Sequence, residues 1–563
     1  MKQKIIDLIA SNVEGLNAEE ISALIEIPPK PELGDFAFPC FRLAKTMRKA
    51  PQMIAADIKE AIGDVDFLQE ISVQGAYLNF FIKKDIFVKS MVEAASSENF
   101  GGSTIGAGKT ICIDYSSPNV AKNFHVGHLR TTIIGNSLYK IYSKLGYDVK
   151  RINHLGDWGT QFGKLIVAYK AWGNEEAVKK DGVGELMKLY VKFHDEAKNN
   201  PALDDEARAW FVKMEQGDEE ALKIWQWFKD ISLIEYKRTY DLLGMDFDYY
   251  LGESFYRDKT DDVVNRLTSA NLLTESEGAK IVDLEAYDMA PCLILKNDGS
   301  SIYATRDLAA IFYRKETYNF VKCLYVTGQE QKLHFAQVFK VVELLGNDWA
   351  KDQLVHIPYG LVSLEGAKLS TRSGNIIYAE DILLEAISKI KEIIEEKNPE
   401  LPDKDETAKK IGVGAVLFND LYNQRIKDVS FKWEKLLNFD GETGPYVQYT
   451  YARCSSILRK LENYDENAPI DYSLITDADS IDLLKEISRF PQVVIDASEK
   501  YEPSQVARFA VAVAQSFNKF YNANRINIED EALKNARVSL VKLTRKTIKD
   551  AMLLLGIECP EQM

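Results

Sequence analysis

Apolar residues recur at helical spacing through most of the chain, and shorter strand-like stretches interrupt them. The first part begins with helical spacing, continues with a loop rich in proline and glycine at 27–40, and then holds a helix at Met53–Ile62 and a strand-like stretch at 71–82. The composition of 96–109 is typical of a flexible linker. This pattern predicts a small α+β domain over residues 1–105.

In the second part strands alternate with helices. A strand at 110–117 is followed by a helix at 125–146 and a second strand at 148–156. Two further strands are predicted later, at 322–328 and 356–364. A strand, a helix and a strand within about fifty residues form the βαβ unit of a parallel, doubly wound sheet. Residues 106–404 are therefore predicted to form a Rossmann-like α/β domain, with a charged helical insertion at about 168–250.

The last part shows helical spacing only. From about Asp405 onward no strand is predicted, and a long helix is expected at Ser504–Asn522. We therefore predict an all-α domain over residues 405–563. Its last helix, at 532–556, carries six basic side chains that form either a solvated face or a surface for nucleic acid: Lys534, Arg537, Lys542, Arg545, Lys546 and Lys549.

Composition limits the class of protein. The 563 residues carry a net charge of −15, which disfavours a nucleic-acid partner, although a local basic face can coexist with an acidic whole. No apolar run approaches the ~18 residues that a membrane helix needs. The N-terminal segment lacks a cleavage site, and the six cysteines are scattered without a CxxC pair. We expect a cytoplasmic protein with no membrane partner.

Two of the six histidines, His125 and His128, lie on either side of Gly127, where a strand gives way to a helix. No third ligand is spaced nearby, so no metal site is predicted. Two histidines packed in the core would give the same pattern. The carboxyl end of a parallel strand is, however, also where open sheets bind anions. There two imidazoles could donate hydrogen bonds to phosphate oxygens, and Gly127 would leave room for the ligand.

Other nucleotide motifs fit less well. Gly108, Lys109 and Thr110 resemble the end of a Walker A loop, but Ser103 occupies the position of its first glycine. Thr110 also begins a predicted strand, whereas that loop should lead into a helix. No GxGxxG sequence follows a predicted strand, so a dinucleotide site is unsupported as well.

The histidine pair has a counterpart elsewhere in the chain. HVGH resembles the HIGH signature of class I aminoacyl-tRNA synthetases, and KLSTR at 368–372 resembles their mobile KMSKS loop. Longer segments are similar to arginyl-tRNA synthetases in particular: 114–138, 153–165, 250–254, 302–310, 328–339, 444–453 and 554–563. The resemblance extends from about residue 75 to the last residue and implies a class I catalytic domain between an N-terminal tRNA-binding domain and a helical anticodon-binding domain.

The resemblance implies a set of residues for each substrate. For L-arginine the set is Asp114, Ser117, Asn119, His128, Glu253, Tyr303, Asp307 and Gln331. For ATP and catalysis it is His125, Gly127, His128, Asp157, Trp158, Gly159, Gln161, Lys368, Ser370 and Arg372. For tRNA it is Tyr77, Asn79, Tyr446, Tyr449, Arg453 and Met563.

The chemistry of arginine fits this set. A guanidinium is planar and always charged, so carboxylates suit it, and Tyr303 and Asp307 would share one face if their segment is helical. As an alternative, Asp307 and Glu253 could simply pair with Arg306 or Arg257 on the surface. Likewise, Tyr77 and Asn79 could be core strand residues, and the tyrosines of 444–453 could serve only in helix packing.

One position departs from the family pattern. Arg372 stands where the second lysine of KMSKS is expected, and Lys122 is close enough to His125 in sequence to supply the missing ammonium. The resemblance implies activation of L-arginine by ATP with Mg²⁺, and transfer to tRNA(Arg), usually only with tRNA bound. We expect a monomer without protein-bound zinc.

Two other functions remain open at this level. The chain could be a class I synthetase for glutamate, glutamine or cysteine, but an acidic substrate would need basic residues at Tyr303 and Asp307, and a cysteine enzyme would need zinc ligands. It could also be a silent tRNA-binding relative, although His125, His128, Lys368, Asn119 and Asp307 are retained together, which argues against it.

Overall fold

The structure is a computed structural model, and it describes all residues except 365–366, 369–377, 462–464 and 466–467. The chain forms two compact units, each assembled from separate segments. The first unit comprises Met1–Phe100, Cys454–Arg489 and Gln515–Thr547, and the second comprises Gly101–Arg453, Phe490–Ala514 and Ile548–Met563. No described helix is both long enough and apolar enough to cross a membrane.

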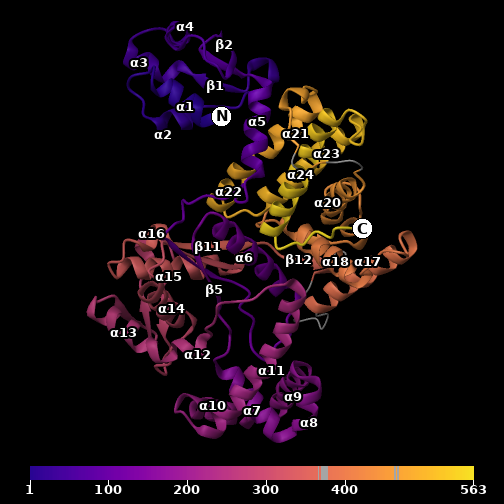
Figure 1. The fold of residues 1–563 in the computed structure, drawn as a ribbon. Coiled ribbons are helices and arrows are strands. Elements are labelled where there is room, and N and C mark those ends of the chain that lie inside the picture. The colour runs from indigo at the N-terminus through magenta and orange to yellow at the C-terminus, as the bar shows by residue number, and fades with distance from the viewer. Residues whose placement is uncertain (365–366, 369–377, 462–464, 466–467) are drawn as a thin grey trace. The chain divides into compact units, whose positions relative to one another are not determined.

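The first unit begins with the predicted α+β fold (Figure 1). Its antiparallel sheet has the order β1-β3-β2. Its elements are α1 (Lys2–Ala10), α2 (Ala18–Leu24), β1 (Phe36–Pro39), α3 (Leu43–Met47), α4 (Pro51–Ile62), β2 (Leu68–Gln74), β3 (Tyr77–Ile82) and α5 (Lys84–Ser96). The prediction of a loop throughout 27–40 is wrong at β1, because a four-residue strand is too short for its period to be recognised among prolines.

The second unit contains the predicted parallel sheet, so the α/β fold class is confirmed. Its order is β11-β10-β4-β5-β6, and every neighbouring pair is parallel. The strands are β4 (Thr110–Asp114), β5 (Asp148–Asn153), β6 (Tyr249–Tyr250), β10 (Lys322–Gly328) and β11 (Leu354–Tyr359). Four helices of this unit carry residues of the candidate active site: α6 (Val126–Lys144), α12 (Glu253–Tyr256), α14 (Tyr303–Tyr318) and α15 (Lys332–Leu344).

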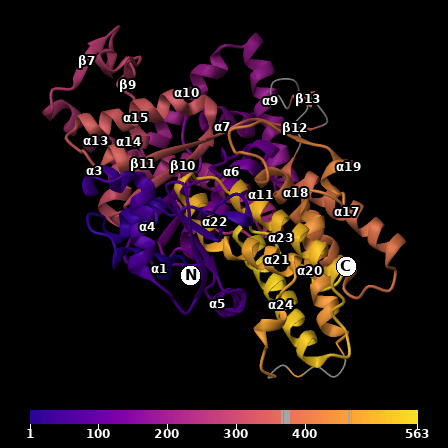
Figure 2. The same cartoon turned by 90° about the horizontal axis from the view of Figure 1, so that it is seen from above.

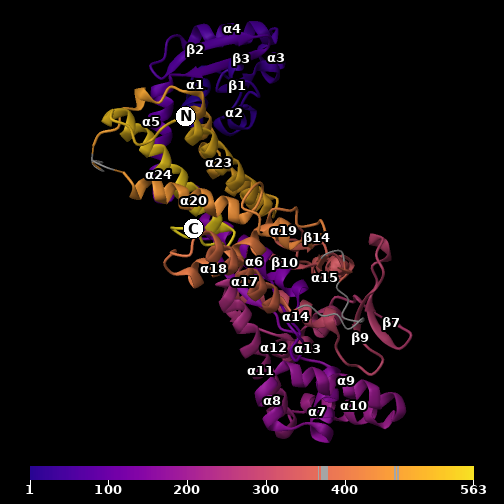
Figure 3. The ribbon, with the colours of Figure 1, turned by 90° about the vertical axis from the view of Figure 1, so that its right-hand side faces the viewer.

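Between β5 and β6 the chain forms five helices, in the region where a helical insertion is predicted. They are α7 (Thr160–Trp172), α8 (Glu175–Asp181), α9 (Val183–Asn199), α10 (Ala202–Glu215) and α11 (Glu219–Leu243). Figures 1 and 3 both show α7 to α10 gathered side by side. An aromatic core that includes Phe162, Phe193, Trp210 and Phe228 holds these helices together.

Two small sheets were not predicted. The antiparallel sheet of β7 (Leu273–Ser276), β8 (Ala279–Val282) and β9 (Cys292–Leu295) lies beside α13 (Thr260–Ser269) (Figure 2). The other sheet has the order β13-β12-β14, from β12 (Val362–Leu364), β13 (Ala367–Lys368) and β14 (Val429–Phe431). The expectation of no strand after Asp405 is therefore wrong at β14, whose three residues are defined by parallel pairing with β12 and not by their own pattern.

The remaining part is helical, as predicted. Its helices are α16 (Ala350–Gln353), α17 (Ala379–Lys397), α18 (Lys404–Leu421), α19 (Trp433–Leu436), α20 (Gly444–Arg459), α21 (Ala478–Ser488), α22 (Phe490–Glu499), α23 (Ser504–Ala523) and α24 (Glu531–Leu554). The long helix expected at Ser504–Asn522 is α23. The six basic side chains of α24 do not form a solvated face, because Lys534 is buried and only Lys549 is largely exposed.

The segment predicted as a flexible linker is packed against the second unit beyond Phe100. Ser103 donates its backbone N–H to the Lys144 carbonyl at 3.3 Å, and Gly106 donates to the Leu145 carbonyl at 3.0 Å. Residues 103–106 are therefore fixed at the carboxyl end of α6, and the expectation of flexibility is wrong there.

Gly163 lets α7 and α10 approach closely, and its replacement tests this contact. A Cβ at Gly163 would lie 2.0 Å from the Ala207 carbonyl oxygen, so Gly163→Ala should destabilise the insertion by about 1–3 kcal/mol through overpacking. The measurement is urea unfolding. As a control, Gly184→Ala in α9 would meet only the flexible Asp181 carboxylate at 2.9 Å and should be neutral or slightly stabilising. Equal effects of the two changes would contradict the explanation.

Candidate active site

The two histidines close the first turn of α6 by bonding to each other's backbone. His125 is the N-cap residue, and its Nδ1 accepts the Gly127 N–H at 3.1 Å. The Nδ1 of His128 accepts the His125 N–H at 3.3 Å. The two imidazole rings are stacked with their centroids 3.9 Å apart. The turn therefore holds both rings in one fixed orientation at the end of the β4–α6 connection.

These contacts determine which ring nitrogen carries the proton. Because both Nδ1 atoms accept hydrogen bonds, each neutral ring carries its proton on Nε2. Burial, and then the charge of Lys122, lower the pKa of His125. Burial followed by His125 and Lys122 lowers the pKa of His128 well below its ordinary value. Both side chains are therefore neutral donors near neutral pH, which suits phosphate oxygens.

Gly127 lies directly against the imidazole ring of His125. A Cβ at this position would lie 2.9 Å from His125 Cε1, so the glycine is needed for the ring of its own neighbour. Its absence of a side chain makes the capping contact of His125 possible. Room for a ligand, the role inferred from the sequence, is compatible with this contact and stays a prediction.

Lys368 is the one residue of the KLSTR segment that lies within the described part of the chain. Lys368 lies on β13, whose backbone pairs with β12, while Ser370 and Arg372 lie outside the described residues. Beyond that gap, Tyr378 forms a backbone bridge with His125, and Asn123 Nδ2 donates to the Tyr378 hydroxyl at 3.1 Å. Tyr378 is thus held at the histidine turn by its backbone and by its hydroxyl group.

A second group of polar side chains surrounds the carboxyl end of β4. Asp114 forms an ion pair with Arg314 at 2.8 Å, and its other oxygen accepts the Ser117 hydroxyl at 2.9 Å. Arg314 is fully buried on α14. Burial alone would lower the pKa of Arg314, but Tyr256 and Asp114 raise it well above the ordinary value. The Asp114 charge is therefore largely neutralised by the protein itself.

This group continues to Asp307 through two histidines. Arg314 lies 3.3 Å from His154 Nδ1, and His154 Nε2 lies 4.0 Å from one Asp307 oxygen. His334 Nε2 lies 2.6 Å from the other Asp307 oxygen. Burial favours the neutral acid, but the contact with His334 and the charges of His154 and His334 hold the pKa of Asp307 below its ordinary value. Asp307 is therefore ionised and oriented from both sides.

Glu253 is a second carboxylate of this region, and its pKa is raised, whereas the pKa of Asp307 is lowered. It is 8% exposed, and burial raises its pKa to about 8. Arg306 Nε lies 3.3 Å from Glu253 Oε2, and neither atom has a hydrogen-bond partner. The charge of Arg306 therefore offsets the effect of burial on the Glu253 pKa only in part. The alternative prediction paired Glu253 with Arg306 or Arg257 on the surface. Glu253 is indeed paired with Arg306, but both residues are buried.

Tyr303 and Asp307 share one face of α14, because the segment is helical as expected. Tyr303 is 63% exposed, and the Arg306 guanidinium carbon lies 5.2 Å from the centre of its ring. Asn119 and Gln331 are also exposed, so both can be reached by a ligand.

The first two side chains of the Asp157-Trp158-Gly159 segment are buried. Asp157 is completely buried, and its carboxylate accepts Lys229 Nζ at 2.7 Å and both the N–H and the hydroxyl of Ser254. Trp158 belongs to the aromatic core of the insertion. Both side chains therefore have their contacts inside the protein, and a place for this segment at the nucleotide border stays a prediction. Only Gly159 and Gln161 of this group are partly exposed.

The residues expected to contact tRNA differ in how exposed their side chains are. Asn79 is buried in β3, whereas Tyr77 is partly exposed and packs edge-on against Phe41. On α20, Tyr449 is exposed beneath the Arg453 guanidinium at 4.9 Å, and Tyr446 is partly buried. The Met563 carbonyl accepts Asn398 Nδ2 at 3.4 Å. Asn79 therefore has the core position that its strand pattern allowed.

Sequence reasoning missed Arg314, His154 and His334. Both histidines lie within the motif segments at 153–165 and 328–339, and their rarity was an available signal. Within the described ranges, no group of three or more His, Cys, Asp or Glu side chains could hold a metal ion.

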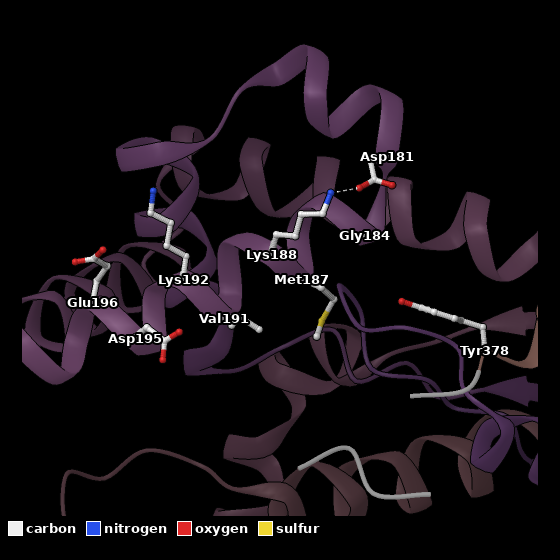
Figure 4. A pocket seen from close by; sticks show the side chains of 9 residues that line it. All are labelled: Asp181, Gly184, Met187, Lys188, Val191, Lys192, Asp195, Glu196 and Tyr378. Carbon is white, nitrogen blue, oxygen red and sulfur yellow. Dashed lines mark hydrogen bonds and ion pairs between the residues drawn. The ribbon is translucent and has the colours of Figure 1, made fainter. Parts of the chain in front are cut away.

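A hollow of about 860 Å³ lies between α9 and Tyr378 (Figure 4). Lys188 bonds Asp181 at 2.6 Å across its rim. Three acidic and two basic side chains line it, which does not favour a polyanion. The lining residues are Asp181, Gly184, Met187, Lys188, Val191, Lys192, Asp195, Glu196 and Tyr378.

A parallel sheet whose β4–α6 turn presents two histidines is the catalytic architecture of class I aminoacyl-tRNA synthetases. The family model of the class I (R) tRNA synthetase catalytic domain matches residues 91–433. The arginyl tRNA synthetase N-terminal domain matches 2–82, and the DALR anticodon binding domain matches 447–563.

The whole chain is similar to known relatives. It is 55% identical to the arginine–tRNA ligase of Clostridium perfringens over the full length of both chains, and 53% identical to that of Alkaliphilus metalliredigens over 100% of this chain and 99% of the relative. The solved arginyl-tRNA synthetase of Thermus thermophilus superposes with a TM-score of 0.84 over both complete chains at 25% identity. The chain therefore belongs to the arginyl-tRNA synthetase family and is an arginine–tRNA ligase.

The proton positions in the histidine turn can be measured directly. Selective ¹⁵N labelling gives few signals, because the chain has six histidines. We expect His125 and His128 to remain neutral at pH 6.5 with the proton on Nε2, since burial lowers the pKa of both rings. Signals are assigned with His125→Gln and His128→Gln. Protonation of either ring at or above pH 6.5 would contradict the assignment.

Proposed function

We propose that arginine is activated and transferred around the carboxyl end of β4, with the guanidinium held by Glu253 and Asp307 and the ATP phosphates held at the histidine turn. The observation that carries this proposal is the buried carboxylate Glu253 beside the oriented carboxylate Asp307. A guanidinium presents forked donors that match two carboxylates in its plane. A wrong amino acid would leave these carboxylates unpaired, which supports discrimination without proofreading.

The other end of arginine would be held near the histidines. Tyr303 would cover the guanidinium, whose cation an aromatic face attracts. The exposed amides of Asn119 and Gln331, together with Ser117 and His128, would bind the α-amino and α-carboxylate groups. Asp114 would contribute mainly through Ser117, since Arg314 already neutralises much of its charge.

In this proposal ATP binds at the N-terminus of α6, where backbone N–H groups and the helix dipole favour anions. The Nε2–H groups of His125 and His128 donate to phosphate oxygens, with Lys368, Ser370 and Arg372 supplying further contacts. Gly159 and Gln161 are the remaining candidates for the nucleotide border. Mg²⁺ would enter bound to the phosphates of ATP, because such ions keep mostly phosphate and water ligands.

No enzyme nucleophile takes part in this reaction scheme. A carboxylate oxygen of arginine attacks the α-phosphorus, and pyrophosphate leaves. A terminal ribose hydroxyl of tRNA(Arg) then attacks the carbonyl carbon of the adenylate, and AMP leaves. The protein positions the groups and stabilises the charge that develops on the phosphates.

For tRNA we propose contacts through Tyr77 on the first unit and through Tyr446, Tyr449 and Arg453 on α20, where aromatic rings and arginine suit splayed bases. Asn79 would act from beneath as a buried support, and Met563 would close the C-terminal edge. We further propose that the enzyme acts as a cytoplasmic monomer, consistent with six free cysteines of which five are buried.

Arginine binding should release a proton from Glu253. Burial raises the pKa of Glu253 to about 8 in the empty pocket, so the group is mostly protonated at pH 7. An adjacent guanidinium favours the carboxylate, so arginine should bind about tenfold more weakly at pH 7 than at pH 9. Calorimetry in buffers of different ionisation enthalpy measures the released proton.

Glu253→Gln should remove both the proton release and this pH dependence. Glu235 also has a raised pKa caused by burial, so Glu235→Gln on α11 is the matched control and should leave both unchanged. Proton release that persists in Glu253→Gln would exclude Glu253 as the guanidinium ligand.

Lys122 should support the chemical step more than nucleotide binding. Its charge lowers the pKa of both His125 and His128, so its ammonium acts on the same corner of the site. Lys122→Ala should reduce arginine-dependent ATP–pyrophosphate exchange by about 10- to 100-fold, with the Kd of ATP changed much less. Exchange at the wild-type rate would show that Lys122 does not replace the missing lysine.

A further inference from the structure

Arg130 lies two residues after His128 in α6, and its side chain is completely buried. One terminal nitrogen, NH1, donates to the Gly360 carbonyl at 2.8 Å and to the Leu361 carbonyl at 3.1 Å. The other, NH2, donates to the Arg425 carbonyl at 3.0 Å and to the Lys427 carbonyl at 2.8 Å. A single side chain thus joins three segments that are far apart in sequence.

The charge of Arg130 has only a partial counter-ion. Asp420 Oδ1 on α18 lies 3.5 Å from Arg130 Nε, and neither atom has a hydrogen-bond partner. Burial raises the pKa of Asp420 to about 6, with Arg130 opposing that rise. The four carbonyl oxygens therefore supply much of the compensation. Only a planar guanidinium can bond them in two directions at once, since an ammonium acts as a single point of charge.

The bonded carbonyls lie at the base of the sheet that carries Lys368. Gly360 and Leu361 connect β11 to β12, and β12 pairs with β13, where Lys368 is located. Arg425 and Lys427 precede β14, which pairs with β12 on its other side. The Leu361 N–H also donates to Asp428 at 2.7 Å. Figures 1 and 2 both show α6, β12 and α18 close together.

We propose that Arg130 is a positioning residue for arginine activation, because it fixes the spacing between the histidine turn and the strand that carries Lys368. This inference rests on the proposed roles of His125, His128 and Lys368. The two phosphate-binding elements belong to different sheets, and Arg130 ties the helix that carries the histidines to the base of the β12 sheet. Its effect is on geometry, and it touches no substrate.

The test compares Arg130→Lys with Arg425→Lys. Arg425 lies in the same region and also bonds carbonyl oxygens, those of Pro358 at 2.6 Å and Tyr501 at 3.0 Å, but its side chain does not bond α6. Both variants lose hydrogen bonds to backbone carbonyls. Both should therefore lose thermal stability, and only Arg130→Lys should alter the site.

Pyrophosphate exchange is measured with tRNA(Arg) present, together with calorimetric binding of arginine alone. For Arg130→Lys we expect kcat to fall about 10- to 100-fold and the KM of ATP to rise, since a displacement of about 1 Å can cost that much. The Kd of arginine should stay within about twofold of wild type, because the proposed guanidinium ligands Glu253 and Asp307 lie on α12 and α14, which Arg130 does not bond. Arg425→Lys should keep near wild-type constants.

Equal kinetic losses in the two variants, or an arginine Kd that rises in parallel, would assign Arg130 a purely structural role and overturn the inference. Unchanged kinetics in a folded Arg130→Lys enzyme would overturn it as well. Should Arg130→Lys fail to fold, Arg130→Gln, which retains two donors and removes the buried charge, is measured in the same way. Wild-type exchange in His125→Ala and His128→Ala would instead refute the proposed function itself.

Discussion

The buried ion pair between Arg314 and Asp114 is the contact on which the proposed arginine site depends. It joins α14 to the carboxyl end of β4 at 2.8 Å, and α14 also carries Tyr303 and Asp307. A buried charge is tolerated only when it is paired, and removing one partner typically costs about 3–5 kcal/mol. The pair therefore keeps α14 at one position on the sheet. His154 extends the same constraint from Arg314 to Asp307.

The larger elements could be predicted from the sequence because each repeats a period several times. The strands at β4, β5 and β10 and the helices α6 and α23 are of this kind. Short strands could not be predicted. β1 and β14 have four and three residues, and their partners are distant in sequence, so pairing and not local pattern defines them. The packed segment at 103–106 likewise owes its order to α6.

From the sequence, the residues of the candidate site could be predicted only where they belong to a recognisable motif. Motif resemblance pointed to Asp157 and Trp158 for the nucleotide, yet both side chains are used inside the protein. Conversely, His154 and His334 flank Asp307 from positions 153 and 27 residues away, a relation that no spacing rule expresses. Side-chain partners in the tertiary structure thus decide which motif residues remain available to a substrate.

The central claim is that this constrained pocket selects arginine and activates it with ATP. It is tested most directly by ATP–pyrophosphate exchange with each of the standard amino acids, with and without tRNA(Arg). Exchange dependent on arginine alone, and absent with lysine, glutamine and glutamate, is the predicted result. Exchange supported by another amino acid, or by none under any condition, would contradict the claim.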